Sequence, residues 1–497
     1  GGIFAKHRPI YTDSGTFVHY DPYFVKDMGH GAEYFVDNLK YSRGESTRHT
    51  GPSTMFRYFY QAGYDWLGAE QMYGPEETIM SALRGTSRAY GKAKYGSLHA
   101  MQWGSRPYTD PRHAHRFYLS LATAYMHGSS HINTEEALWI DEYAHDRFSE
   151  SGKAHIAAQK KIFDFIQTHE RRGQQVNDIA LVQGRNCAWK SFGRGPIWSQ
   201  RGEKWETNKA IESFDFIKIF YPQNINYSGT QGLFTSMPYG AIDLLPVEAD
   251  QDLLNQYQTI IFLGWNTYNQ RDWRRLTRFV NKGGTLIFSA AHLNAELQPH
   301  LQPRFPENDE PIQQLLGENY RQFKEKKTIS YGKGKVIYFP QSVYPADESI
   351  RESYREAIKG EAEKVSKEQW SKGWIIPNEK TSFTVWDEGK RRTICLLNID
   401  WSTSNNQSTA QFYLGDSVYE ISPRSYFMET IHIKAGLGLM PQANTTDILS
   451  IETDSNSWLI EVQTTGPDNL QVFRGDKQKA DTISIAESGI HNIEIWH

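Results

Sequence analysis

Short apolar segments alternate with segments of helical length over the first part of the chain. The apolar segments each end in carboxylate, imidazole, amide or indole side chains, and they run over 64–70, 95–102 and 129–135. The helical segments run over 52–62, 75–90, 111–126 and 150–169. This spacing predicts consecutive parallel strands of a β/α barrel whose polar strand ends form a site. The stretch before Gly51 has poor periodicity and predicts long loops, with one candidate strand over 16–20.

A second α/β pattern begins at Asp178 and predicts a flavodoxin-like unit. Its expected strands lie at 178–182, 257–263, 285–289 and 334–339, and its expected helices at 210–220, 271–282 and 349–364. The motif Asn281-Lys-Gly-Gly-Thr-Leu-Ile287 indicates a helix end, a capping glycine and a strand start. The polar, proline-containing stretch 294–330 predicts a loop or an insertion.

After Trp374 the pattern changes to short strands separated by turn residues. These strands are expected at 383–386, 392–397, 410–414 and 426–431, and similar segments continue to the end. This predicts one or two β-sandwich modules. We therefore expect an α/β chain with three parts: a catalytic C-terminal part of a (β/α) barrel over 1–175, a flavodoxin-like or glutamine-amidotransferase-like domain over 176–365, and a β-sandwich over 366–497.

The composition narrows the classes of function. The chain has 497 residues and a formal net charge of -4, so it lacks the excess of basic residues that is typical of nucleic-acid-binding proteins. No apolar run is long enough to span a bilayer. Aromatic residues make up 13%, with 14 Trp and 28 Tyr, which suits the stacking of flat rings on sugars as well as core packing.

Cysteine and histidine spacing predicts neither a metal site nor a cofactor. Cys187 and Cys395 are far apart in sequence and suggest no disulfide framework. Cys187 lies in Gly184-Arg-Asn-Cys-Ala188, which lacks the Gly-x-Cys-x-Gly elbow of a nucleophile, so we expect that domain to be structural. His113 and His115 are two positions apart on a predicted helix and face different ways. The other histidines show no paired ligand pattern.

Glu70 and Glu135 are the candidate catalytic residues. Glycoside cleavage needs one carboxyl group to protonate the leaving oxygen and another to attack carbon or activate water. Both glutamates end predicted strands, and the strand ends of a barrel face the same mouth. The alternative is that each is a solvated residue just past a strand. Glu136 is the alternative to Glu135 as the second carboxylate. Successive side chains on a strand point to opposite faces, so only one of the two can point into the site.

Neighbouring polar and aromatic residues are candidates for substrate binding. His99 and Gln102 could bind sugar hydroxyls or tune a carboxyl pKa, and the alternative is a buried, hydrogen-bonded histidine and a loop glutamine. Asn133 could bind a hydroxyl or orient Glu135, and the alternative is a turn or ladder role. Three aromatic residues are candidate stacking platforms, with ordinary packing as the alternative: Tyr73, Trp103 and Trp139.

The order of parts resembles the family-42 β-galactosidases and related clan-A glycoside hydrolases. The predicted barrel is followed by a flavodoxin-like domain with Leu244-Leu-Pro246 and Phe279-Val-Asn-Lys-Gly-Gly284, and then by a small β-sandwich. His127-Gly-Ser-Ser-His-Ile132 stands where those enzymes have their last barrel strand. The resemblance covers most of the chain and implies a glycosidase. Because the middle domain often builds a trimer in that family, it also implies a homo-oligomer.

Two features depart from that resemblance. In the clan, the acid/base glutamate follows an asparagine on the fourth strand and the nucleophile ends the seventh. Here the segment ending in Gln102 would be the seventh strand, and the Asn378-Glu379 pair lies outside the barrel. About 175 residues precede the second domain, whereas a full barrel takes about 250, so we expect either an incomplete barrel or a chain that lacks the N-terminal part of the polypeptide. The clan's catalytic assignments are therefore not carried over.

The leading hypothesis is a secreted or periplasmic glycosidase that cleaves O-glycosidic bonds of a poly- or oligosaccharide with Glu70 and Glu135. Its expected partner is a carbohydrate, without nucleic acid or a membrane span. The alternative is a non-catalytic glycan-binding or structural protein on a decayed glycosidase fold. A polysaccharide lyase with a Tyr or His base is a third hypothesis, against which the order of domains argues. The sequence leaves open the sugar, the linkage and the stereochemical outcome.

Overall fold

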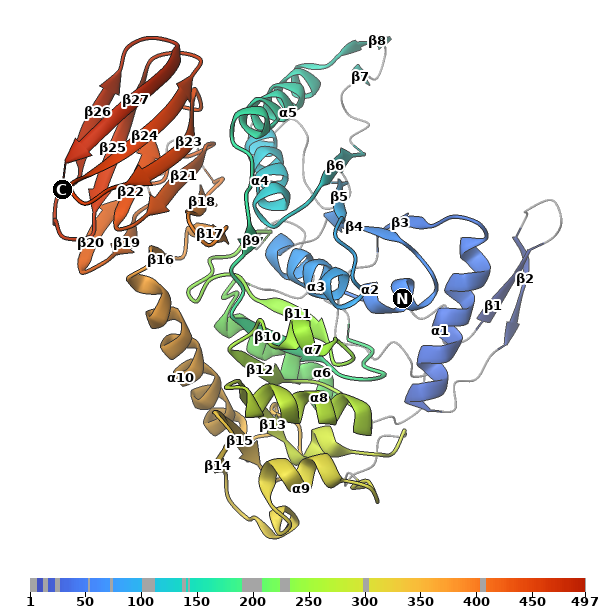
Figure 1. Ribbon diagram of the computed structural model, residues 1–497. Helices are drawn as coiled ribbons and strands as arrows, with labels where there is room; N and C mark the ends of the chain where they lie inside the picture. The colour runs from blue at the N-terminus through green and yellow to red at the C-terminus, as the bar shows by residue number, and fades with distance from the viewer. Residues whose placement is uncertain are drawn as a thin grey trace.

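The computed structural model describes residues 7–11, 17–22, 27–51, 54–71, 75–100, 112–135, 140–141, 144–189, 208–223, 233–297, 304–402 and 408–496. Within them the chain mixes helices and strands up to Trp370 and is β-stranded from Trp374 onward (Figure 1). No helix in this described part combines the length and the apolar character needed to cross a membrane.

The predicted strands of the N-terminal region form a parallel sheet, called the first sheet below. Its strands lie side by side in the order β3 (Arg48–Thr50), β4 (Trp66–Gln71), β5 (Gly96–His99) and β6 (His131–Thr134). The accompanying helices are α2 (Phe56–Gln61), α3 (Glu76–Ala89), α4 (Arg112–Met126) and α5 (Glu150–Thr168). The predicted alternation of strands and helices is therefore confirmed in this region, and β3 extends it toward the N-terminus.

Helices α3 and α4 cover one face of the first sheet. Their apolar residues recur at helical spacing and are fully buried, as Leu83 and Phe117 illustrate. They pack on strand residues such as Leu67 and Ala69 of β4, which are also fully buried. This packing fixes which side chains of the strands point away from the helices.

Residues 28–43 form a helix, α1 (Met28–Arg43), where the sequence predicted loops. The Asp27 carboxylate caps it by accepting a hydrogen bond from the backbone N–H of His30 at 2.8 Å. Four buried apolar residues recur along it at helical spacing: Met28, Ala32, Phe35 and Leu39. The prediction was wrong because this stripe is narrow and the surrounding glycines and polar residues weaken the periodicity. Before α1, β1 (His7–Tyr11) pairs antiparallel with β2 (Phe17–Pro22), which confirms the expected strand.

A second parallel sheet follows, called the second sheet below. Its order is β11 (Asp243–Pro246), β10 (Ile179–Gln183), β12 (Thr259–Phe262), β13 (Thr285–Ser289), β15 (Gly334–Phe339) and β14 (Lys327–Tyr331). The strands are parallel except β14, which pairs antiparallel with β15. The four predicted strands of this region are present.

Helices cover both faces of the second sheet. One face packs on α8 (Gln270–Asn281) and α9 (Glu310–Leu316), and the other on α10 (Arg351–Trp370) and the 3-10 helix Ser213–Ile219. The stretch 294–330 was predicted as a loop or insertion, but α9, a 3-10 turn (Tyr320–Gln322) and part of β14 lie in it. Buried Ile312 and Leu315 hold α9 on the sheet, and such a short apolar pattern is hard to detect among polar residues.

The C-terminal region consists of antiparallel strands. One sheet has the order β26-β25-β22-β21-β18-β17-β9, a second β16-β19-β20 and a third β23-β24-β27. The bounds are β9 (Gln174–Gln175), β16 (Trp374–Pro377), β17 (Thr381–Asp387), β18 (Arg392–Asn398), β19 (Ala410–Leu414), β20 (Ser417–Ile421), β21 (Met428–Lys434), β22 (Leu437–Pro441), β23 (Thr446–Thr453), β24 (Ser457–Thr464), β25 (Asp468–Arg474), β26 (Asp481–Ile485) and β27 (Gly489–Trp496). Because β9 pairs with β17, the segment after α5 joins the C-terminal region.

The first and second sheets are joined by a buried ion cluster between α3 and β11. Asp243 is fully buried, and its carboxylate accepts from Arg84 Nε at 2.7 Å, Arg88 Nη1 at 2.6 Å and the Tyr257 hydroxyl at 2.7 Å. At Gly85 an added Cβ would lie 2.3 Å from the Leu244 carbonyl oxygen. The glycine therefore lets α3 approach β11 closely, and the ion cluster fixes the first sheet against the second.

Candidate functional site

The side chains of β4 alternate between the helix-covered face and the opposite face of the first sheet. Leu67, Ala69 and Gln71 are fully buried toward the helices. Trp66 and Glu70 point to the other face and keep part of their surface exposed. This opposite face, called the open face below, is where the structure places the first candidate carboxylate.

The strand register brings the second candidate carboxylate onto the same face. Glu70 pairs with Leu98 of β5, and Leu98 pairs with Asn133 of β6. Glu135 lies two residues beyond Asn133, so its side chain leaves the same face one step further along, and it is exposed. Adjacent strands lie about 4.8 Å apart, so Glu70 and Asn133 start from backbone positions roughly 10 Å apart. Side chains of this length can converge on one sugar ring.

Burial and the charge of Glu135 together raise the pKa of Glu70. The Glu135 charge can act in this way only if the two carboxyl groups are electrostatically close. Glu70 also lies near the loop after β3: at Gly51, which has φ +130°, an added Cβ would be 3.3 Å from Glu70 Oε2 and 3.5 Å from His49 Nε2. The glycine therefore leaves space beside the Glu70 carboxyl group.

An indole ring lies against the same open face, at the level of Gly68 and Gly96. An added Cβ at Gly96 would be 2.3 Å from the Trp66 ring, and one at Gly68 would be 3.0 Å from it. The Trp66 ring also meets His131 of β6 edge to face, with centroids 5.8 Å apart. Sequence reasoning missed Trp66 and His131. The available signal was the pair of glycines on adjacent strands, which marks a place where a large ring crosses the sheet.

His99 lies on the helix-covered face of the first sheet, away from Glu70. It is fully buried, and its ring nitrogens bond to Ser97 Oγ at 2.9 Å and Ser120 Oγ at 2.6 Å. Burial lowers the pKa of His99 to about 3, so the imidazole is neutral. This arrangement matches the alternative of a buried, hydrogen-bonded histidine, and we give His99 no substrate contact in the proposal below.

Five of the candidate residues fall just after the strand ends, in segments outside the described residues: Tyr73, Gln102, Trp103, Glu136 and Trp139. Their roles stay predictions from the sequence. Asn133 is described, and it lies exposed on the open face at the level of Glu70, two strands away.

Two further carboxyl groups lie buried at the start of α3. Glu76 accepts a hydrogen bond from Ser120 Oγ, and Glu77 accepts one from Ser382 Oγ at 3.3 Å. Burial raises the pKa of each to about 8. Because both side chains are almost fully buried, they support the fold beneath the site rather than forming part of its surface.

The strand ends of the second sheet are closed by their own loops. An added Cβ at Gly184 would lie 2.2 Å from the Trp265 carbonyl oxygen, and the Arg185 backbone N–H donates to Asn266 Oδ1 at 2.9 Å. Cys187 is buried, and burial raises the pKa of its thiol to about 11, which keeps it protonated. The loop packing and the protonated thiol support the expectation that this domain is structural.

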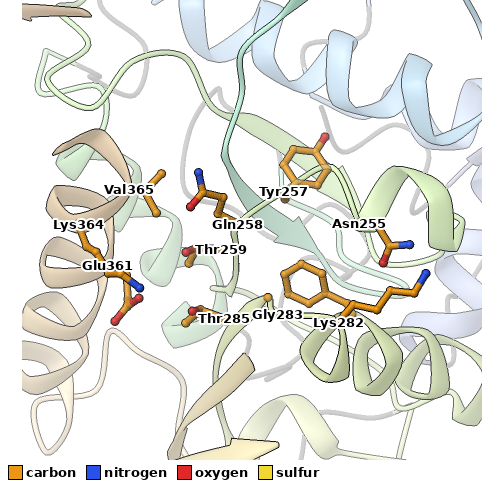
Figure 2. Close-up of a pocket in the computed structure, with 12 residues that line it drawn as sticks. Asn255, Tyr257, Gln258, Thr259, Lys282, Gly283, Thr285, Glu361, Lys364 and Val365 are labelled. Atoms are coloured by element: carbon orange, nitrogen blue, oxygen red, sulfur yellow. The ribbon is translucent and has the colours of Figure 1, made fainter. Parts of the chain in front are cut away.

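A polar cavity of about 200 Å³ lies at the opposite edge of the second sheet (Figure 2). It is lined by the amino ends of β12 and β13, including Thr259 and Thr285, and by Glu361 of α10. Ligands of open α/β sheets bind at the carboxyl ends of the strands, not at this edge. Glu361 is also already paired with Lys335. We therefore place the candidate site on the open face of the first sheet.

Comparisons with known proteins give similarity in structure but not in sequence. No protein-family model matches the chain, and no curated protein matches it. Among solved structures, it is similar to Gan42B, a GH42 β-galactosidase from G. stearothermophilus, with 12% identity, a TM-score of 0.49, and coverage of 86% of this chain and 71% of that one. The β-galactosidase from Rahnella sp. R3 gives the same identity, coverage and TM-score.

A more distant similarity is to the exo-carrageenase GH42 from Bacteroides ovatus, with 9% identity, a TM-score of 0.35, and coverage of 98% of this chain and 59% of that one. The chain thus resembles family-42 β-galactosidases and other clan-A glycoside hydrolases in structure, as its order of parts predicts. These similarities assign no role to any residue of this chain.

Proposed function

We propose that this chain is a glycoside hydrolase that cleaves an O-glycosidic bond of a poly- or oligosaccharide on the open face of the first sheet. In this proposal the first sheet belongs to a β/α barrel, the second sheet to a flavodoxin-like domain, and the C-terminal strands to β-sandwich modules. The observation that carries the proposal is the placement of Glu70 and Glu135 on one open face with their charges coupled.

The environments of the two carboxyl groups favour different roles. The raised pKa of Glu70 favours its protonated form, which can donate a proton to the leaving oxygen. Glu135 is exposed, so its carboxyl group is accessible to attack the anomeric carbon or to activate a water molecule. We therefore assign Glu70 as the general acid and Glu135 as the carboxylate partner.

Trp66 and Asn133 are the described groups best placed to hold the sugar. The Trp66 ring crosses the open face over Gly68 and Gly96 toward His131, so it offers a flat apolar surface to the C–H face of a sugar. Asn133 is exposed on the same face at the level of Glu70 and can donate to or accept from a hydroxyl. The aromatic candidates after the strand ends would add to this surface.

The test is a panel of aryl glycosides and polysaccharides with wild-type protein, Glu70→Gln and Glu135→Gln. We expect wild type to release reducing sugar and each variant to turn over roughly 10²–10⁴-fold more slowly with an unchanged melting temperature. Glu45→Gln, an exposed glutamate after α1, is the control and should keep wild-type rates.

Three results would count against this proposal. Binding of a glycan without product release would favour a non-catalytic glycan-binding protein. An unsaturated product that absorbs in the ultraviolet would favour a lyase. Unchanged turnover of both glutamate variants would remove Glu70 and Glu135 from the reaction.

A further inference from the structure

The sheet β23-β24-β27 packs on the rest of the C-terminal region with only one of its faces. Inward side chains such as Ile451, Ile460 and Ile495 are buried. They contact the apolar residues Leu439 and Val472 of β22 and β25. Because side chains alternate along each strand, the register defines a second face that points outward.

The outward face carries large apolar side chains where the alternation calls for polar ones. Leu459 is 46% exposed, Ile490 is 61% exposed and Trp496 is 61% exposed. They account for three of the seven large hydrophobic side chains that are exposed in the described part of the chain. Leu459 and Trp496 are neighbours at one end of this face, and Ile490 lies at the other end of β27, opposite Gln463.

The backbone around Trp496 holds its ring on this face. Trp496 pairs with Ser457 of β24, and its carbonyl oxygen accepts a hydrogen bond from Arg474 Nη1 at 3.0 Å. Leu459 is the next outward residue on β24, so it lies diagonally beside Trp496. The indole is therefore presented on paired strand rather than on a loose chain end.

Polar groups that match sugar hydroxyls surround the ring. Glu494 is the next outward residue on β27, and its carboxylate accepts from Ser457 Oγ at 3.0 Å. Glu461 and Asn492 pair across β24 and β27 on the same face. At the outward positions of these three described strands there is no Lys or Arg.

We propose that this outward face, defined by Leu459, Ile490, Glu494 and Trp496, binds a neutral glycan chain. The indole would stack on the C–H face of a sugar ring, and the carboxylate and amide groups would accept its hydroxyl protons. Because the face bears carboxylates and no cation, it disfavours sulfated or uronic-acid glycans. The carboxylates also disfavour a purely apolar partner, since burying them unpaired is unfavourable.

This surface is distinct from the candidate site on the first sheet, and Figure 1 shows α4 and α5 between the C-terminal strands and β5. The proposal does not depend on hydrolysis. Its variants leave Glu70 and Glu135 untouched, so binding and turnover can fail separately.

The experiment is affinity electrophoresis of the full chain in gels that contain neutral galactan, xylan, glucan or mannan, or anionic pectate or carrageenan. We expect retardation by at least one neutral polysaccharide and by neither anionic one. Trp496→Ala should weaken that binding about tenfold, whereas Trp496→Tyr should retain most of it. Tyr41→Ala, which removes an aromatic ring that is 46% exposed on α1, is the matched control and should bind like wild type.

The proposal is overturned if no neutral polysaccharide retards the wild type, or if Trp496→Ala is retarded as strongly as wild type. It is also overturned if sedimentation shows that Trp496→Ala dissociates an oligomer, because the face would then be an interface between copies. The melting temperature of Trp496→Ala should match that of wild type, which shows that the variant is folded.

Discussion

The first and second sheets are both parallel and both pack on helices, but they differ in the number of faces that helices cover. In the second sheet, every residue of β10, β11, β12 and β13 is buried. In the first sheet, Trp66, Glu70, Leu98 and Asn133 keep exposed surface on the open face. The candidate catalytic carboxylates lie on the sheet that has an uncovered face. A carboxylate on a sheet that helices cover on both faces would need a buried partner.

The two sheets also use their glycines differently. Gly184 and Gly85 let backbone elements approach each other, which closes the second sheet and joins it to α3. Gly68 and Gly96 instead make room for the Trp66 ring on the open face. The same residue type therefore closes one sheet and shapes a surface on the other.

The largest expected change in stability comes from the contact between the two sheets. Asp243→Asn leaves the buried Arg84 and the half-buried Arg88 without a counter-charge, so we expect the free energy of unfolding to fall by about 3–5 kcal/mol. Chemical denaturation followed by tryptophan fluorescence measures this change. The exposed pair Arg274–Glu310, 2.9 Å apart, provides the control: Glu310→Gln should change stability by less than about 1 kcal/mol. Equal effects would contradict a structural role for the buried cluster.

We expect a smaller loss of stability when a side chain is added at Gly96 on the open face of the first sheet. Gly96→Ala would put a Cβ 2.3 Å from the Trp66 ring and 2.7 Å from the His131 carbonyl oxygen, so the ring must move. We expect a loss of about 1–3 kcal/mol in stability and a higher KM for any glycoside substrate. Gly360→Ala in α10 has no atom within 4 Å of the new Cβ and should stabilise the protein by about 0.5–1 kcal/mol. A neutral Gly96→Ala would show that the ring does not lie there.

A pH-dependent effect concerns the carboxyl groups buried beneath the first sheet. The pKa of Glu77 is raised to about 8 from an ordinary value of 4.5, so the folded state keeps a proton that the unfolded state releases. Stability should therefore fall as the pH rises from about 4.5 to about 8. Glu77→Gln removes this ionisation, so its melting temperature relative to wild type should be higher at pH 8 than at pH 5. A constant difference across this range would contradict the buried, protonated state.

Sequence reasoning located most strands of both sheets because their apolar runs are bounded by glycines, prolines and polar ends, but it missed β3, β11 and β14. It could not place side chains whose neighbours come from distant parts of the chain. The Glu77 partner, Ser382, is 305 residues away, so an acidic helix start gave no sign of burial. His99 is similarly tied to Ser120 of α4.

Only part of the candidate site could be predicted from the sequence. Glu70 and Glu135 follow from strand ends and the chemistry of glycoside cleavage, and they remain proposals. The open face itself could not be predicted, because it depends on which residues α3 and α4 cover. The alternation of Trp66, Gly68 and Glu70 on one strand becomes informative only once β5 supplies Gly96 beside it.

The most direct test of the central claim is the effect of the leaving group on Glu70→Gln. A general acid matters when the leaving oxygen is basic and matters little when the departing group is a stable anion. The account predicts that Glu70→Gln lowers kcat/KM for a phenyl glycoside by roughly 10²–10⁴-fold but much less for the 2,4-dinitrophenyl glycoside. Glu135→Gln should lower both. Equal losses on the two substrates for Glu70→Gln, or no loss on either, would contradict the assignment of Glu70 as the acid.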